Sequence, residues 1–369
     1  MLADTIRDAR ARRQGLRIVA GQSWLDAGRP VDATHTLSVA ESRGIIEYVP
    51  GDLTLTARAG TSIAELYEAT RAHGQWLPLD PWGVDTGTLG ATITTATPGP
   101  HAHAMGLPRD VVLGLEFVSG AGDTIRAGGR VVKNVAGFDL TRLVIGSWGT
   151  LGVVTEVTVR LRARPQSMRT LLLQPRADAA ALNELAVKLR ALPFTPLAAE
   201  LVNAGLAMRL GVAKAAALIV RLGGNDVSVA RQLDLLRALG PFDDAADAVW
   251  GALRQADAGS IASWRWAALP SAFGDTWVAA DAAAQRLGDA GVSGSAMRGV
   301  VRVSARSLHD IPQVMKTVQA FPGSVVLEKL PAGAWQFVRP RAHDTLHGML
   351  RRRFDPDGVL NPGIMGMMP

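Results

Sequence analysis

Two pairs of histidines have a spacing that suits metal binding or acid–base chemistry. His101 and His103 alternate, as on one face of an extended segment, and imidazole is a common metal ligand. No third ligand is apparent near them, so we expect a loop pair and no metal. His343 and His347 stand one helical turn apart, which places both on the same side of a helix. They are candidates for a catalytic base, and a partly exposed helix face is the alternative.

Other kinds of chemistry are excluded by what the sequence lacks. The chain contains no cysteine, which removes disulfides, thiol catalysis and cysteine ligation of zinc or iron–sulfur clusters. If redox chemistry occurs here, electrons must leave through a bound organic cofactor. The sequence has no GxGxxG after a strand, no GxxxxGK[ST], no HExxH and no GxSxG. A large dinucleotide would therefore have to be bound by a fold other than the Rossmann fold.

The composition is that of a globular protein with two or three domains. The chain has 369 residues, of which 48% are hydrophobic, so it can bury a large core. No window approaches the length of a membrane span, and the N-terminus has no apolar segment typical of a signal peptide, so we expect a cytoplasmic protein. The net charge of +6 comes from scattered arginines that do not form a stripe, which argues against nucleic acid as a partner.

A glycine-punctuated region leads into a strand between Lys133 and Leu161. Four glycines, at positions 137, 146, 149 and 152, precede a run in which Val153, Val157 and Val159 alternate with polar residues. This alternation predicts a strand with one buried face. The glycines allow the backbone to come close to a neighbour just before the strand begins.

Elements around this strand indicate a mixed α+β fold. Strands are predicted at 16–20, 36–39, 45–49, 53–57 and 111–118, and Ser62 with Glu65 forms a capping box that opens a helix ending at Gly74. The segment 77–106 is predicted to be mostly loop, and its small residues favour close approach to a ligand. Beyond Pro165, alternating strands and helices predict a split βαβ arrangement followed by a second βαβ-like set, which together form one sheet backed by helices.

The segment VVKNVAGFDLTRLVIGSWGTLGVVTE, residues 131–156, resembles the end of the FAD-binding domain in flavoproteins of the vanillyl-alcohol-oxidase type, also called PCMH-type. Within this family, the chain is most similar to the FAD-binding subunits of bacterial glycolate oxidase (glycolate dehydrogenase) complexes. The likeness extends from Glu47 to Pro165 and returns at FDPDGVLNP, residues 354–362. It implies a two-subdomain FAD-binding domain at 1–165, an α+β cap domain for substrate or partner at 166–340, and a C-terminal segment, 341–369, that returns to the FAD domain.

The resemblance also implies which residues hold the cofactor. The diphosphate of FAD would lie between two bends whose backbone N–H groups form an anion site, one at Ala20–Ser23 and one at Thr88–Ala91. Gly152 to Val154 would contact the adenine, and Asn361 would bring the C-terminal segment over the cofactor. The complete expected set is Gly21, Gln22, Ser23, Asp80, Pro81, Thr88, Leu89, Gly90, Ala91, Thr94, Thr95, Gly99, His101, Arg109, Asp110, Gly152, Val153, Val154 and Asn361.

The sequence departs from the family pattern at both bends. Ala20 and Ala91 stand where the family has glycine, and each added Cβ narrows the room for phosphate oxygens. Family members that bind FAD covalently use a histidine in the first bend or a cysteine elsewhere. Gln22, Ser23 and the absence of cysteine therefore imply noncovalent FAD.

The function implied by the resemblance is oxidation of a 2-hydroxy acid, glycolate, to glyoxylate. The subunit would work with a second flavoprotein subunit and an iron–sulfur subunit, through which it could associate with a membrane. Candidates for the carboxylate ligand are Arg265, Arg302 and Lys329, and candidates for the base are His309, His343 and His347. Two alternatives remain: a self-sufficient flavin dehydrogenase for another hydroxy acid or sugar alcohol, and a structural partner subunit that has lost FAD.

Overall fold

The computed structural model describes residues 2–129, 138–338 and 345–366, and these divide into two compact units. The first unit comprises residues 1–98, 106–164 and 339–369, and the second comprises 99–105 and 165–338. The short segment 99–105 thus groups with the second unit, although it lies within the range expected for the FAD domain. His343 and the residues 133–137 of the glycine-rich stretch lie outside the described residues.

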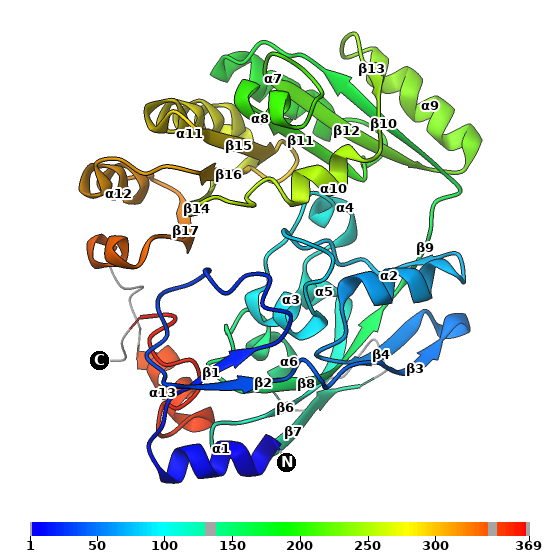
Figure 1. Ribbon diagram of the computed structural model, residues 1–369. Coiled ribbons are helices and arrows are strands. Elements are labelled where there is room, and N and C mark those ends of the chain that lie inside the picture. The colour runs from blue at the N-terminus through cyan, green and yellow to red at the C-terminus, as the bar shows by residue number, and fades with distance from the viewer. Residues whose placement is uncertain (1, 130–137, 339–344, 367–369) are drawn as a thin grey trace. The chain divides into compact units, whose positions relative to one another are not determined.

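The first unit is organised around a five-stranded antiparallel sheet in the order β3-β4-β8-β6-β7 (Figure 1). Its strands are β3 (Ile45–Val49), β4 (Thr54–Arg58), β6 (Val112–Val118), β7 (Thr124–Gly128) and β8 (Val153–Arg160). Helices α2 (Ile63–Arg71), α3 (Leu89–Thr95) and α6 (Leu140–Val144) contribute Leu66, Ile93 and Val144 to a shared core with the sheet. The one-face burial predicted for β8 is confirmed by the alternation of buried and half-buried residues from Val157 to Leu161.

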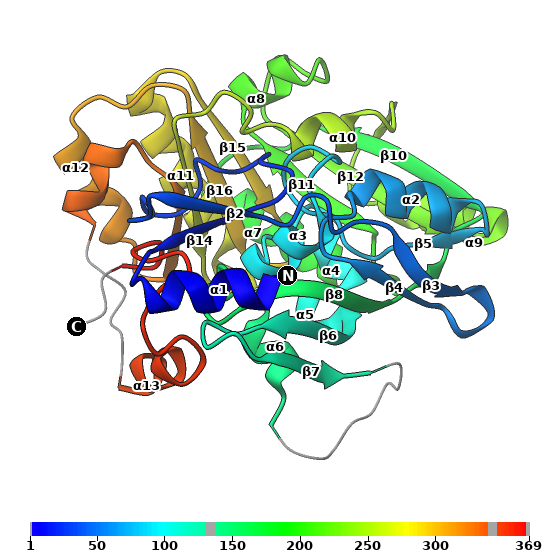
Figure 2. The ribbon, with the colours of Figure 1, turned by 60° about the horizontal axis from the view of Figure 1, so that its bottom comes forward.

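A smaller layer of the first unit contains helix α1 (Leu2–Ala11) and the parallel pair β1 (Leu16–Val19) and β2 (His35–Ser38) (Figure 2). Leu360 forms a parallel bridge with Leu16, so the C-terminal segment lies beside β1. The remaining elements of this unit are η1 (Pro50–Asp52), β5 (Gln75–Trp76), α5 (Pro108–Val111), β9 (Arg162–Ala163) and α13 (Thr345–Phe354).

The second unit is one eight-stranded sheet in which every pairing is antiparallel, in the order β13-β10-β12-β11-β15-β16-β14-β17. The strands are β10 (Ser167–Leu173), β11 (Ala198–Val202), β12 (Ala217–Gly224), β13 (Asp243–Ala245), β14 (Ala262–Ala267), β15 (Ala290–Ser295), β16 (Val300–Ala305) and β17 (Ser324–Lys329). The single sheet agrees with the expectation, and so does the split βαβ arrangement. In each half of the sheet, the two strands joined through a helix are separated by a third strand, in the orders β10-β12-β11 and β15-β16-β14.

Helices supply the core on one face of this sheet. Buried residues of α7 (Ala179–Arg190), α9 (Asp226–Arg237), α11 (Phe273–Leu287) and α12 (Ile311–Gln319) pack with apolar residues of the strands. Trp264, Trp277 and Phe273 are among the largest fully buried side chains. The other elements are α4 (Ala102–Met105), α8 (Ala204–Arg209), α10 (Val249–Arg254), η2 (Pro270–Ala272) and η3 (Ala332–Phe337). No helix within the described residues is both long and apolar enough to cross a membrane.

The segment 77–106 is mostly loop, as expected, but it also contains helix α3, which the sequence did not predict. Its sequence, LGATITT, is poor in good helix formers, and hydroxyl groups compensate. The Thr88 side chain accepts a hydrogen bond from the N–H of Ala91, and Thr92 and Thr94 donate to the carbonyls four residues earlier. The threonines therefore fix a short helix where propensity alone predicts a loop.

Candidate cofactor site

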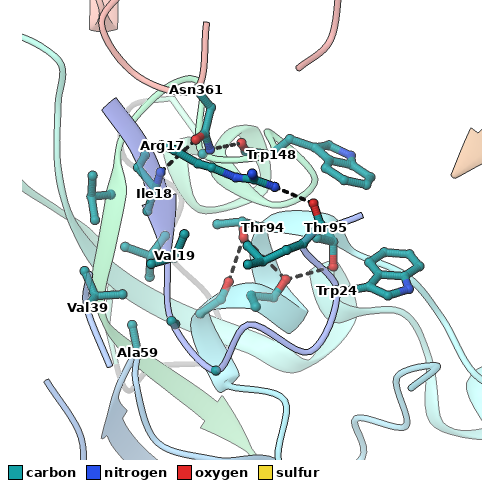
Figure 3. Close-up of a pocket in the computed structure, with 18 of the residues that line it drawn as sticks. Arg17, Ile18, Val19, Trp24, Val39, Ala59, Thr94, Thr95, Trp148 and Asn361 are labelled. Atoms are coloured by element: carbon teal, nitrogen blue, oxygen red, sulfur yellow. Dashed lines mark hydrogen bonds between the residues drawn. The ribbon is translucent and has the colours of Figure 1, made fainter. Parts of the chain in front are cut away.

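A pocket in the first unit is lined by segments that are far apart in the sequence (Figure 3). Strand β1 and the bend that follows it form one wall, and helix α3 forms another. The beginning of β8, the turn at Trp148 and Gly149, and the C-terminal residues Asn361 and Ile364 complete it. A groove made by five separate segments is typical of a cofactor site held on a rigid scaffold.

Many of the residues expected from the sequence come together here. Those that line the pocket are Gly21, Gln22, Ser23, Gly90, Ala91, Thr94, Thr95, Gly152, Val153, Val154 and Asn361. Ala20, the other departure from the family pattern, also lines it. Ala91 is exposed and Ala20 is half-buried.

The first bend offers the backbone donors that an anion requires. Gln22 has a φ of 55°, a left-handed conformation that turns the chain sharply after β1. In the described part of the chain, the backbone N–H groups of Gly21, Gln22 and Ser23 donate to no other group. Consecutive N–H groups that point outward from such a bend form a concave anion site.

The second bend is different, because its N–H groups already have acceptors. Leu89 donates to the carbonyl of Thr61 at 2.8 Å, and Gly90 donates to the carbonyl of Ala59 at 2.8 Å. The N–H of Ala91 is taken by the side chain of Thr88. This bend therefore contributes the surfaces of Gly90 and Ala91 to the pocket lining, and helix α3 adds Thr94 and Thr95.

Glycines are required where the backbone elements of the pocket wall meet. A Cβ at Gly152 would lie 2.3 Å from the Phe117 ring, and one at Gly90 would lie 2.8 Å from the Cβ of Ala59. Gly149 has a φ of 70°, and a Cβ there would lie 2.9 Å from the Nδ2 atom of Asn361. Because these positions carry no Cβ, the segments that contain them can approach their neighbours closely enough to form one continuous wall.

Asn361 joins three segments of the pocket wall. Its Oδ1 accepts a hydrogen bond from the N–H of Ile18 at 2.8 Å, and its Nδ2 donates to the carbonyl of Trp148 at 2.9 Å. The residue is buried and has a φ of 42°, a conformation that asparagine tolerates better than most residues. The side chain therefore fixes β1 and the Trp148 turn to the C-terminal segment.

We expect Asn361→Ala to lower the free energy of unfolding by about 2–4 kcal/mol, because it removes two buried hydrogen bonds and keeps an unfavourable φ. Asn361→Asp should cost at least as much, because it still accepts from Ile18 but places a buried carboxylate oxygen against the Trp148 carbonyl. Asn361→Gly relieves the backbone and isolates the effect of the hydrogen bonds. Urea denaturation of the three variants measures these differences, and equal stabilities of all three would contradict the assignment.

Two tryptophans stand at one side of the pocket. Trp24 and Trp148 are stacked with ring centroids 6.0 Å apart and an interplanar angle of 21°, and both line the pocket. The Nε1 atom of Trp24 is buried and has no hydrogen-bond partner within the described residues. The expected set did not include these rings or Arg17. The signal that could have found them is their position directly beside the first bend and the glycine run.

The other expected cofactor residues do not line this pocket. Asp80 and Pro81 lie in the loop after β5, and exposed Arg109 and Asp110 belong to α5, where Asp110 accepts from the N–H of Leu107 at 2.9 Å. Thr88 caps α3, and Leu89 is fully buried in the core. Gly99 and His101 belong to the second unit.

The two histidines at 101 and 103 do not form an alternating extended pair, because the chain turns there into the short helix α4. His101 is buried in the second unit, with its Nε2 3.1 Å from the Nη1 of Arg221 and its ring against Trp250. Burial lowers the pKa of His103, and the nearby Arg298 and Arg190 lower it further. The described residues contain no group of three side chains that could hold a metal ion.

Among the catalytic candidates, Arg302 is already engaged in a buried charge cluster. It contacts both carboxylate oxygens of Glu328, at 2.9 Å for the Nη2 pair, and lies 3.8 Å from Asp257. Arg265 donates to the same Glu328 carboxylate at 2.6 Å. Burial lowers the pKa of Arg302. These contacts favour a structural role for both arginines. His309 and His347 are exposed.

Comparison with known proteins identifies the class of this domain. Residues 1–128 match the family model described as an FAD binding domain. The fold matches the solved structure of p-cresol methylhydroxylase with substrate bound, with a TM-score of 0.75 and 15% identity, over 99% of this chain and 86% of that one. It also matches 4-ethylphenol oxidase from Gulosibacter chungangensis, with a TM-score of 0.72 and 15% identity, over 100% and 88% of the two chains. The chain therefore has the fold of these two enzymes, and its first 128 residues match an FAD binding domain.

Sequence relatives narrow the class further. The chain is 39% identical over 172 residues to glycolate oxidase subunit GlcE of Escherichia coli, which covers 46% of this chain and 49% of that protein. It is 39% identical over 153 residues to glycolate oxidase subunit GlcD of Bacillus subtilis, which covers 41% and 33%. The chain thus spans half or less of the length of these relatives. Over the shared part, the sequence is similar to these two glycolate oxidase subunits.

The first bend and the residues around it fit the FAD that this class of domain binds. The N–H groups of Gly21 to Ser23, which have no acceptor among the described residues, suit the diphosphate, and the glycine-rich wall allows a flat ring to approach the backbone. The methyl groups of Ala20 and Ala91 form part of the pocket lining and do not close it.

Proposed function

We propose that this chain is the FAD-binding subunit of an enzyme that oxidises a 2-hydroxy acid, with glycolate as the substrate and glyoxylate as the product. The pocket of the first unit, with its unpaired N–H groups and its five-segment wall, is the observation that carries the proposal. The names of the relatives support the substrate class, since they include glycolate oxidase subunits and a mitochondrial D-lactate dehydrogenase of Arabidopsis thaliana, 40% identical over 115 residues.

The residues of the pocket bind and orient the cofactor. When bound, the flavin accepts the two electrons and the hydrogen that leave the hydroxyl-bearing carbon of the substrate. We assign the diphosphate to the bend at Gly21–Ser23, the adenine to Gly152–Val154, and the closing of the site to Asn361. The cofactor is held without a covalent bond, because Gln22 and Ser23 occupy the first bend and the chain has no cysteine.

The second unit, which we take as the cap domain for substrate or partner, has the polar groups that a hydroxy acid requires. Arg298 is half-buried and forms no ion pair within 4 Å with any residue the structure describes, although the negative charge of Glu200 acts on it. The positive charge of Arg298 lowers the pKa of His103, and both residues belong to the second unit. Arg265, Arg302 and Lys329 were the carboxylate candidates from the sequence. Arg298 is the better candidate, because Glu328 already neutralises the first two of them.

Electrons must then pass to an acceptor outside this chain. No cysteine is available to ligate an iron–sulfur cluster, and the relatives are named as subunits. We therefore propose a second flavoprotein subunit and an iron–sulfur subunit as partners.

The purified chain, incubated with FAD and dialysed, should retain a flavin absorption spectrum, and acid precipitation should release the flavin into the supernatant. Glycolate should then reduce a dye when the partner subunits are present. Glycerol, which has no carboxylate, serves as the control substrate. A chain that takes up no flavin would overturn the proposal, and full glycolate oxidation by the chain alone would overturn the role of the partners.

Binding of FAD should quench the tryptophan fluorescence of the chain, because Trp24 and Trp148 line the pocket and flavins accept excitation energy from nearby indoles. Trp24→Phe keeps an aromatic ring against Trp148 but removes one emitter, so the quenched amplitude should fall while FAD is still bound. Fluorescence titration measures both values. An unchanged amplitude would place the cofactor away from Trp24.

A further inference from the structure

Among the described residues that line the pocket, Arg17 is the one with a charged side chain. It lies on β1, four residues before Gly21, and is half-buried. Within the described part of the chain it forms no ion pair with a carboxylate, and the pocket lining contains no acidic residue. The pocket therefore carries one uncompensated positive charge.

The position of this guanidinium is fixed by a contact across the first bend. Arg17 Nη2 donates to the carbonyl of Leu25, which follows the bend, and Figure 3 shows the side chain extended across the pocket from its strand. The unpaired N–H groups of Gly21, Gln22 and Ser23 belong to the chain between these two residues. The guanidinium and these donors thus belong to one short segment, residues 17–25, whose residues line the same pocket.

The positive charge of Arg17 compensates for the second bend, whose backbone donors are already in use. The N–H groups of Leu89, Gly90 and Ala91 already donate to acceptors within the protein, so these groups of the second bend are not available to a phosphate. Of the two bends, the first is then the one that offers backbone donors to a diphosphate in the pocket. A guanidinium supplies both a full positive charge and paired N–H donors that match phosphate oxygens.

We propose that Arg17 is the residue that neutralises the diphosphate of FAD and positions it against the Gly21–Ser23 bend. This inference rests on the FAD site described above. Arg17 keeps or exchanges its bond to the Leu25 carbonyl while its remaining donors bind phosphate oxygens, because a guanidinium has five N–H groups. The selectivity of the pocket for phosphorylated over unphosphorylated flavins would then come from this side chain.

Three ligands and two variants test the assignment. The wild-type chain, Arg17→Gln and Arg17→Lys are titrated with FAD, with ADP and with riboflavin, and binding is followed by fluorescence or calorimetry. Arg17→Gln should weaken FAD and ADP roughly 10- to 100-fold, as expected for a lost hydrogen bond to a charged group. Riboflavin, which has no phosphate, should bind equally to all three proteins. Arg17→Lys keeps the charge and should fall between the other two.

The dependence on salt gives a second readout that a structural role of Arg17 would not change. Added salt should weaken FAD binding to the wild type and to Arg17→Lys more than to Arg17→Gln, because the pairing of charges is screened. Thermal melting of the proteins without FAD shows whether loss of the Leu25 contact destabilises the bend. If Arg17→Gln does not fold, Arg17→Met and Arg17→Lys are compared in the same way.

The outcomes separate this inference from the proposed function. If the wild type binds neither FAD nor ADP, the proposed function fails. If the wild type binds FAD and Arg17→Gln binds it equally well, with the same salt dependence, the assignment of Arg17 fails and the proposed function stands. A parallel loss of riboflavin and FAD binding would show that Arg17 only shapes the bend, and would also overturn the assignment.

Discussion

Replacing Glu328 with glutamine is expected to destabilise the second unit by about 3–5 kcal/mol. Glu328 is fully buried and bonds to Arg265 at 2.6 Å and to Arg302 at 2.9 Å. These arginines are direct cross-strand partners on β14 and β16, so their like charges face each other when the carboxylate is lost. Asp257 lies 3.8 Å from Arg302 and compensates for only one of them.

A double variant provides the matched control for this prediction. Replacing Arg302 with Met and Glu328 with Leu removes both charges together and leaves buried Asp257 and half-buried Arg265 without these partners. The double variant should still cost less than Glu328→Gln alone, because two like-charged arginines no longer face each other across the strands. Urea denaturation gives the total stability, and hydrogen–deuterium exchange of β14, β16 and β17 localises the change. A loss below 1 kcal/mol in Glu328→Gln would show that water or Asp257 replaces the carboxylate.

Introducing a negative charge at Ala91 is expected to reduce the affinity for FAD about 10- to 100-fold. Ala91 is exposed on α3 and lines the pocket, so a glutamate there would face the diphosphate across the pocket. Two like charges a few Å apart in a partly enclosed site repel each other by about 1–4 kcal/mol. The expected loss follows from this repulsion.

Ala91→Gln has nearly the same shape without the charge and isolates the electrostatic part of the effect. Both variants should have the stability of the wild type, since position 91 is exposed and glutamate is well tolerated in the first turn of a helix. Isothermal titration with FAD measures the two affinities. Equal affinities for Ala91→Glu and Ala91→Gln would place the diphosphate away from α3.

The parts of the fold that could be predicted are those in which local signals agree. Ser62 and Glu65 form the expected capping box at the start of α2, with both reciprocal hydrogen bonds present. The alternation in β8 predicted its buried face. In each case, a short run of residues contains all the information that sets the element.

The parts that could not be predicted depend on distant partners. Strand β15 has the sequence AGVSGS, with no strand-like composition, yet every residue in it is buried. Gly294 allows the rings of Phe273 and Trp277 on α11 to pack directly over the strand, since a Cβ there would lie 3.1 Å from both. The large side chains that stabilise β15 thus come from another element.

The same distinction applies to the candidate site. Residues in contiguous motifs, such as Gly21–Ser23 and Gly152–Val154, were found from the sequence and line the pocket. Arg17 was missed because a single arginine in a short strand has no spacing that marks it. Thr88 and Leu89 were included because they stand in the second bend, although one caps a helix and the other fills the core.

The pairing of Leu16 with Leu360 has a consequence for how the protein is made. These residues are separated by 360 − 16 = 344 positions, so the ribosome translates the whole second unit before the C-terminal segment can join β1, which until then pairs with β2 alone. At about 5–20 residues per second this interval is roughly 20–70 s. During that time the pocket lacks the part of its wall that Asn361 supplies, so we expect cofactor capture to follow translation of Asn361.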